Sequence, residues 1–113
     1  DSAGMAVHLD AARRGVAMFK DVGVPILGIV ENMSYFVCDA CGKRHHIFAH
    51  GGARAESQKL AIPFLGEIPL ELDIRERSDA GLPVVVTAPD SDAAKTYRAI
   101  AAQVWASVQK RAV

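Results

Sequence analysis

Cysteine is scarce in this chain, which has two among 113 residues, and so are long apolar runs. Two cysteines are too few for the disulfide framework of a small secreted domain, so we expect a reducing compartment, the cytoplasm. Spanning a bilayer takes about 20 consecutive apolar residues, and no run approaches that length. The opening DSAGMAVHLD also lacks the charged flank and apolar stretch of a signal peptide. The sequence therefore predicts neither membrane insertion nor secretion.

An excess of charge of one sign is missing too. Thirteen Lys and Arg residues balance 13 Asp and Glu residues, for a formal net charge of zero. Nucleic acids and anionic membranes attract concentrated positive charge, so nothing here predicts either as a partner. Half of the residues are apolar, which is enough for one compact core. Because the chain begins at Asp1 rather than at methionine, we expect residues 1–113 to be a single-domain fragment of a longer protein.

The order of apolar segments predicts an α/β domain with a largely parallel sheet. Amphipathic patterns over residues 7–22 and 91–110 predict long helices, with Trp105 on the core side of the second. A continuous apolar run over 26–30 predicts a strand buried on both faces, as in a parallel sheet under helices, and residues 62–69 predict another short apolar strand. The sequence further predicts a helix from 51 to 60, a helix over 72–80 and a third β-rich run over 82–86.

The stretch YFVCDACGKRHHIF contains both cysteines, Cys38 and Cys41. Residues 35–37 and 46–48 flank turn-forming residues like the arms of a β-hairpin, which puts the cysteines near its tip. The CxxC spacing lets two sulfurs reach one metal atom. Thiolates suit zinc, copper(I) or the iron of an iron–sulfur cluster, so the spacing indicates a metal site.

A closed metal site of this kind takes four ligands, and the cysteines supply two. Either His45 or His46 could add a third, but adjacent residues on a strand point to opposite faces, so at most one would face the sulfurs. A two-fold dimer would instead bring a second Cys38 and Cys41 opposite the first pair. A redox pair and two structural cysteines stay open as alternatives, although a redox pair normally begins a helix and the turn here is polar.

Three stretches together resemble the C-terminal half of Mrp/ApbC-type iron–sulfur carrier proteins, which are P-loop ATPases related to the MinD/ParA group. They are VPILGIVENMSYFVCDACGKRHHIF, GEIPLELDIRERSDAGLPVVV and PDSDAAKTYRAIA. The mitochondrial relative that supplies clusters to respiratory complex I is similar too. The resemblance covers residues 12–102 and is specific, because ENMSYF, the CxxC pair and IPL follow one another in this order.

The resemblance implies part of a doubly wound sheet with the CxxC hairpin as an insertion. It implies a homodimer that bridges a [4Fe-4S] cluster through Cys38 and Cys41 of each subunit and transfers it to apo iron–sulfur client proteins. In this family Asn32 would contact adenine, while Pro69 and Leu70 would belong to a loop that borders the base. The next position is often aspartate in relatives and is Glu71 here.

The phosphate end of a nucleotide site is missing from these residues. No G-x-x-x-x-G-K-[ST] sequence occurs, and no strand with a Mg²⁺-binding aspartate can be placed. We therefore expect ATP and Mg²⁺ to bind in the full-length parent, and this chain to have no catalytic residue and no ATPase activity alone. Two other hypotheses remain: a structural zinc-binding module that uses the cysteines and one histidine, and an ATPase partner domain that binds no metal.

Overall fold

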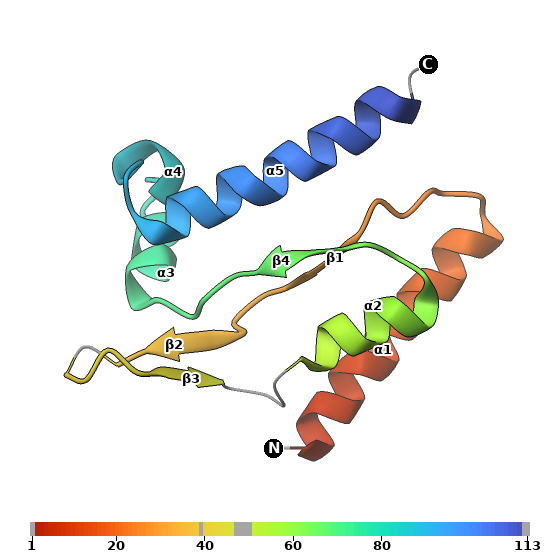
Figure 1. Cartoon of the computed structure of the whole chain (residues 1–113), viewed down its shortest axis with the longest axis horizontal. Coiled ribbons are helices and arrows are strands. Elements are labelled where there is room, and N and C mark those ends of the chain that lie inside the picture. The colour runs from red at the N-terminus through yellow and green to blue at the C-terminus, as the bar shows by residue number, and fades with distance from the viewer. Residues whose placement is uncertain (1, 39, 47–50, 112–113) are drawn as a thin grey trace.

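The chain forms both helices and strands in the computed structural model, which describes residues 2–38, 40–46 and 51–111 (Figure 1). The long helices α1 (Ser2–Asp21) and α5 (Asp92–Arg111) lie near its two ends. The other elements, in chain order, are β1 (Ile29–Glu31), β2 (Tyr35–Val37), β3 (Arg44–His46), α2 (Gly52–Leu60), β4 (Phe64–Glu67), α3 (Leu72–Asp79) and α4 (Val84–Thr87). None of the described helices has the length and apolar character that crossing a membrane requires. The predicted α/β class is confirmed.

The central sheet is formed by β1 and β4, which run parallel although the hairpin and α2 separate them in sequence. Ile29 lies opposite Phe64 and Glu31 opposite Glu67, with a bulge after Ile29. Figure 1 shows α5 on one side of these strands and α1 with α2 on the other. Gln103 of α5 fixes one of these contacts, because its side-chain amide donates to the Leu65 carbonyl at 2.8 Å. Helices therefore cover both faces of a parallel pair, which is the doubly wound arrangement.

Two glycines allow close packing around the sheet. A Cβ on Gly28, just before β1, would lie 2.4 Å from Cγ of Leu65 in β4. A Cβ on Gly66 would lie 3.1 Å from the Ile100 side chain of α5, and the φ of 155° at Gly66 disfavours other residues. Both positions depend on the absence of a side chain.

The third β-rich run, predicted over residues 82–86, is wrong, because Val84–Thr87 form the short helix α4. The Thr87 and Ala88 N–H groups donate to the carbonyls of Pro83 and Val84 at 3.0 and 2.8 Å. Pro83 precedes the first helical residue with φ −54°, a value suited to entering a helix. The β preference of valine reflects packing on a pleated surface, and no described strand lies beside this segment.

The predicted burial of β1 on both faces and of Trp105 in the core is also wrong for the described residues. Val30 is 38% exposed and Trp105 is 62% exposed. Both sequence patterns predicted apolar side chains, but a side chain is buried only where another element packs over it. With one partner strand beside β1, much of this apolar surface stays open.

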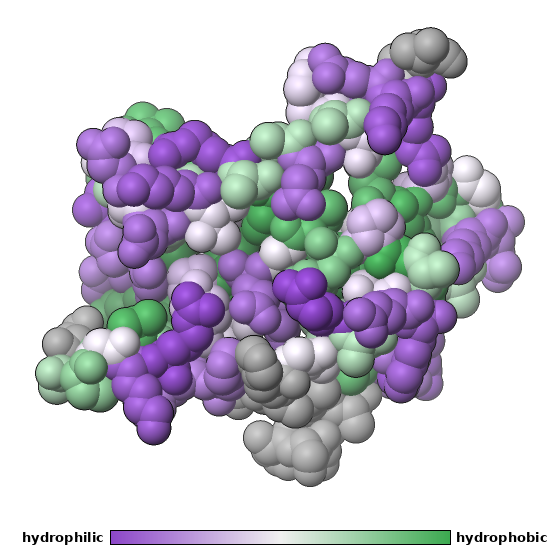
Figure 2. Space-filling model, viewed as in Figure 1, coloured by the Kyte–Doolittle hydropathy of each residue, from purple (hydrophilic) through white to green (hydrophobic). Residues whose placement is uncertain are grey.

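The buried apolar core of the described residues is small. The fold is also less compact than usual, since its Cα radius of gyration is 15.6 Å and a compact domain of this size has about 13 Å. Figure 2 shows hydrophobic surface in the middle of this face, between α5 and the two helices α1 and α2. The buried apolar residues are Ile62, Ile68, Val84, Ala93 and Ala94.

Candidate functional site

The hairpin of β2 and β3 carries both cysteines at its turn, as the sequence predicts. The Cys38 N–H donates to the Lys43 carbonyl at 2.9 Å, and the Gly42 N–H donates to the Cys38 carbonyl at 2.7 Å. Gly42 has a φ of 69°, which glycine adopts without a steric cost. The second arm begins at Arg44, two residues before the predicted 46–48, and Ile47 and Phe48 lie outside the described residues. The paired residues are Tyr35 with His46, Phe36 with His45, and Val37 with Arg44.

Both cysteines lie near the surface. Cys41 is exposed and Cys38 is partly exposed. Buried cysteines that act as small hydrophobes avoid solvent, so this exposure argues against two purely structural residues. In the part of the chain that the structure describes, no group of three or more His, Cys, Asp or Glu side chains could hold a metal ion. These residues thus contribute two thiols from one hairpin turn.

The two histidines pack against aromatic rings of β2. The His45 ring stacks on Phe36, with centroids 4.9 Å apart and planes 15° apart. The His46 ring meets Tyr35 edge-on at 6.4 Å. These contacts stiffen the arms of the hairpin below the turn. Within the described residues neither histidine forms a three-ligand group with the cysteines.

The loops after β1 and β4 run side by side at the carboxyl end of the sheet. The Ile68 N–H donates to the Glu31 carbonyl at 2.8 Å, and the Ser34 N–H donates to the Ile68 carbonyl at 3.0 Å. Asn32 therefore lies beside the segment that continues into Pro69 and Leu70. Ligands of open α/β sheets bind at this end of the strands. The structure thus brings all three proposed base-site residues to one edge.

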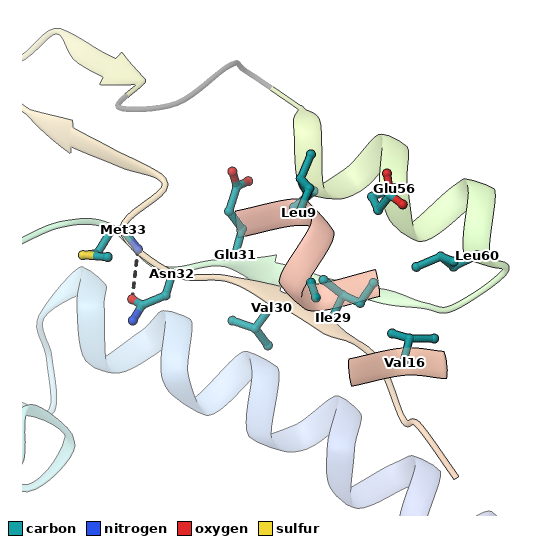
Figure 3. Close-up of a pocket in the computed structure, with 11 residues that line it drawn as sticks. Leu9, Val16, Ile29, Val30, Glu31, Asn32, Met33, Glu56 and Leu60 are labelled. Carbon is teal, nitrogen blue, oxygen red and sulfur yellow. Dashed lines mark hydrogen bonds between the residues drawn. The ribbon is translucent and has the colours of Figure 1, made fainter. Parts of the chain in front are cut away.

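Asn32 already has a local role there. Its Oδ1 accepts a hydrogen bond from the Met33 N–H at 2.9 Å, drawn as the dashed line in Figure 3. Met33 has a φ of 54°, an unusual value for this residue type. The asparagine side chain therefore supports a tight turn. Its amide NH₂, with two donors, is a different group and can serve a ligand.

A cavity of about 250 Å³ lies next to Asn32, between α1, β1 and α2 (Figure 3). Most of its wall is apolar and includes Leu9, Val16 and Leu60. Glu56 is also in the wall, although only 6% of the residue is exposed. No local sequence pattern predicts this cavity, because its lining residues come from three separate elements.

The buried Glu56 is paired with Arg13 of α1. The guanidinium donates from Nε to Oε1 at 2.5 Å and from Nη2 to Oε2 at 2.8 Å. These hydrogen bonds, together with the positive charge, lower the pKa of Glu56 below its ordinary value of 4.5, while burial acts in the opposite direction. A two-pronged pair of this kind fixes geometry. Glu56 is therefore an ionised link between α1 and α2.

A second hollow, of about 410 Å³, lies beside the hairpin and is lined by Phe36, Val37, Leu70, Glu71, Leu72 and Asp73. The pKa of Glu71 is raised, first by burial and then by the negative charges of Asp73 and Asp92. Apolar and acidic side chains thus line a hollow that reaches Val37, the residue before Cys38.

The family model described as ParA, NUBPL iron-transfer P-loop NTPase, matches residues 2–105. The chain belongs to this family. An iron-sulfur cluster transfer protein NUBPL of Dictyostelium discoideum is 54% identical over 91 residues, which are 80% of this chain and 28% of the relative. An iron-sulfur cluster carrier protein of Synechocystis is 45% identical over 108 residues, which are 95% of this chain and 31% of the relative.

A solved structure supports the same assignment. The nucleotide-binding protein of Archaeoglobus fulgidus, in complex with ADP, aligns with a TM-score of 0.58 and 35% identity. The alignment covers 72% of this chain and 32% of that protein. The chain therefore spans less than a third of each of these relatives.

Proposed function

We propose that this chain is the cluster-binding part of an iron–sulfur carrier ATPase of the Mrp/ApbC type. The observation that carries the proposal is the position of two cysteines, Cys38 and Cys41, at the surface turn of one hairpin in an iron-transfer family. A [4Fe-4S] cluster takes four cysteine thiolates. Two copies of the hairpin supply this set, so the cluster is bridged between two subunits. Apo iron–sulfur proteins then receive it, and exposed thiols suit a reducing compartment such as the cytoplasm.

The nucleotide part of the proposal assigns the adenine to the edge formed by Asn32, Pro69 and Leu70. The Asn32 amide is the polar group there, and the other two supply the wall of the loop. The phosphates and Mg²⁺ would bind to a phosphate loop, which these 113 residues do not contain. The chain is then the C-terminal part of a longer ATPase, in agreement with the short span that it shares with its relatives.

The cluster is tested by anaerobic reconstitution with iron and sulfide. We expect a brown protein with about four iron atoms per two chains. Cys38→Ser and Cys41→Ser should each abolish the visible absorption, because a hydroxyl is a poor ligand for this iron. His45→Ala is the control and should keep the colour. A colourless protein that holds stoichiometric zinc, lost in His45→Ala or His46→Ala, would contradict the proposal and favour the zinc module.

The nucleotide site is tested by isothermal titration with ATP. The chain alone should bind at best near 1 mM, which corresponds to about 4 kcal/mol, because it lacks the donors that hold the phosphates. It should show no ATPase activity. In a longer protein that includes the phosphate loop, Asn32→Ala should weaken ATP binding by roughly 2- to 10-fold, the loss of one neutral hydrogen bond. The cluster absorption should not change. Micromolar ATP binding by the chain alone would refute this part.

A further inference from the structure

The hollow next to the cysteine turn has the features of a docking groove. It lies between β2 and the beginning of α3, with apolar side chains left exposed on both walls. Val37 is 50% exposed on the strand side and Leu72 is 68% exposed on the helix side. Figure 2 shows hydrophobic surface at this end of the molecule, near the hairpin. Exposed apolar patches of this kind are typical of interaction sites, and this one lies beside the two cysteines.

Beyond Tyr35, the outer edge of β2 is not paired with another described strand in this groove. The Tyr35 carbonyl accepts from the Leu70 N–H at 2.6 Å, so this residue bonds on the side away from β3. Bonding direction alternates along an antiparallel strand, so the peptide groups of Val37 face the same outer side. The chain turns away at Leu72 into α3, and β3 is the only strand paired with β2 among the described residues. Open strand edges bind further extended segments.

The charges of the groove and of the hairpin are complementary. Glu71 and Asp73 line the groove. Lys43 and Arg44 are exposed on the hairpin, just past the cysteines. The same chain thus carries an acidic groove and a basic, extended segment. In a two-fold dimer, the acidic groove of each copy can face the basic segment of the other copy. One surface that carries both features is therefore complementary to itself.

We infer that this groove seats the CxxC hairpin of a second copy of the chain, with Lys43 of each copy against Glu71 of the other. The inference rests on the proposed function, since two thiols per chain leave a four-thiolate cluster incomplete without the second copy. Antiparallel pairing of the two β2 edges around Val37 puts Cys38, the next residue, close to the two-fold axis in both copies. The turn that follows then lies along residues 70–73 of the partner.

Charge reversal tests this arrangement. Lys43→Glu and Glu71→Lys should each weaken the cluster-loaded dimer by at least about tenfold at low salt, because each puts like charges together twice. The double variant should restore the dimer, and that rescue shows that both variants fold. Lys59→Glu and Glu76→Lys are controls that make the same charge changes at exposed positions on α2 and α3. Sedimentation velocity measures the dimer, and visible absorption measures the cluster.

The two proposals fail in different ways. Weakening in both single variants with rescue in the double variant supports the groove. If neither single variant changes the dimer while the brown colour persists, the groove is not the interface and the inference is wrong, but the cluster proposal stands. If the unaltered chain never takes up a cluster, the proposed function fails and this inference fails with it.

Discussion

Gly28 is a position where one added methyl group should damage the fold. A Cβ there would lie 2.4, 2.6 and 2.8 Å from Cγ, Cδ1 and Cδ2 of Leu65. Carbon atoms pack best about 3.5–4.0 Å apart, so the overlap involves the body of the leucine side chain and not only its tip. Relief requires Leu65 to leave its position in β4 or the two strands to separate.

The size of the effect follows from two opposing contributions. Overpacking of this kind costs about 1–3 kcal/mol, and replacing glycine by alanine returns about 0.4–1 kcal/mol by restricting the unfolded chain. We therefore expect Gly28→Ala to lower the free energy of unfolding by about 1–2 kcal/mol, roughly 5- to 30-fold in the folding equilibrium.

Gly15 provides the matched control for this prediction. It lies within α1, and a Cβ added there would meet nothing within 4 Å. Gly15→Ala should therefore raise stability by about 0.5–1 kcal/mol, because alanine favours a helix interior. Urea unfolding followed by circular dichroism measures both variants, provided that the m-values agree. If Gly28→Ala is as stable as Gly15→Ala, the close contact between the segment before β1 and Leu65 does not exist in solution.

Two further predictions concern α2. The folded-state pKa of Glu56 lies below its ordinary 4.5, so the pairing with Arg13 adds stability that is present above that pH and is lost as the pH falls through the folded-state pKa. In Glu56→Gln, the free energy of unfolding should therefore fall less steeply as the pH drops below 4.5. The same pH dependence in the variant and the unaltered chain would contradict the pairing. Ala61, which ends α2 with a φ of 55°, adopts a conformation that favours glycine. Ala61→Gly should raise the free energy of unfolding by about 0.5–1 kcal/mol, which a higher urea midpoint would show. A lower midpoint would refute the strain at Ala61.

Local signals in the sequence predicted the elements that depend on local interactions. Helix α1 ends at Asp21, where Gly23 adopts a φ of 73° and Pro25 prevents continuation. The hairpin likewise follows from its turn residues. Valines at 84–86 pointed to a strand and formed a helix instead, because strand formation depends on a neighbour that is distant in sequence. The exposure of Trp105 has the same cause, since a pattern predicts a face but not what covers it.

The candidate site divides in the same way. The spacing of Cys38 and Cys41 is visible in the sequence, whereas the position of Asn32 beside Pro69 depends on strand pairing and came from the family resemblance. The groove could not be predicted, because its strand edge and its acidic wall meet only when the segment after β4 reaches β2.

One backbone segment holds the base edge and the cysteine hairpin in place. Ile68 hydrogen bonds with Glu31 and Ser34 on either side of the asparagine turn, and two residues later Leu70 donates to Tyr35 at the start of β2. The segment is therefore a wall of the proposed adenine site and also the edge partner of the strand that leads to Cys38. Because backbone hydrogen bonds of 2.6–3.0 Å allow little sliding, a displacement of this segment moves the hairpin as well. The position of the cysteine turn is thus tied to the geometry of the proposed nucleotide edge.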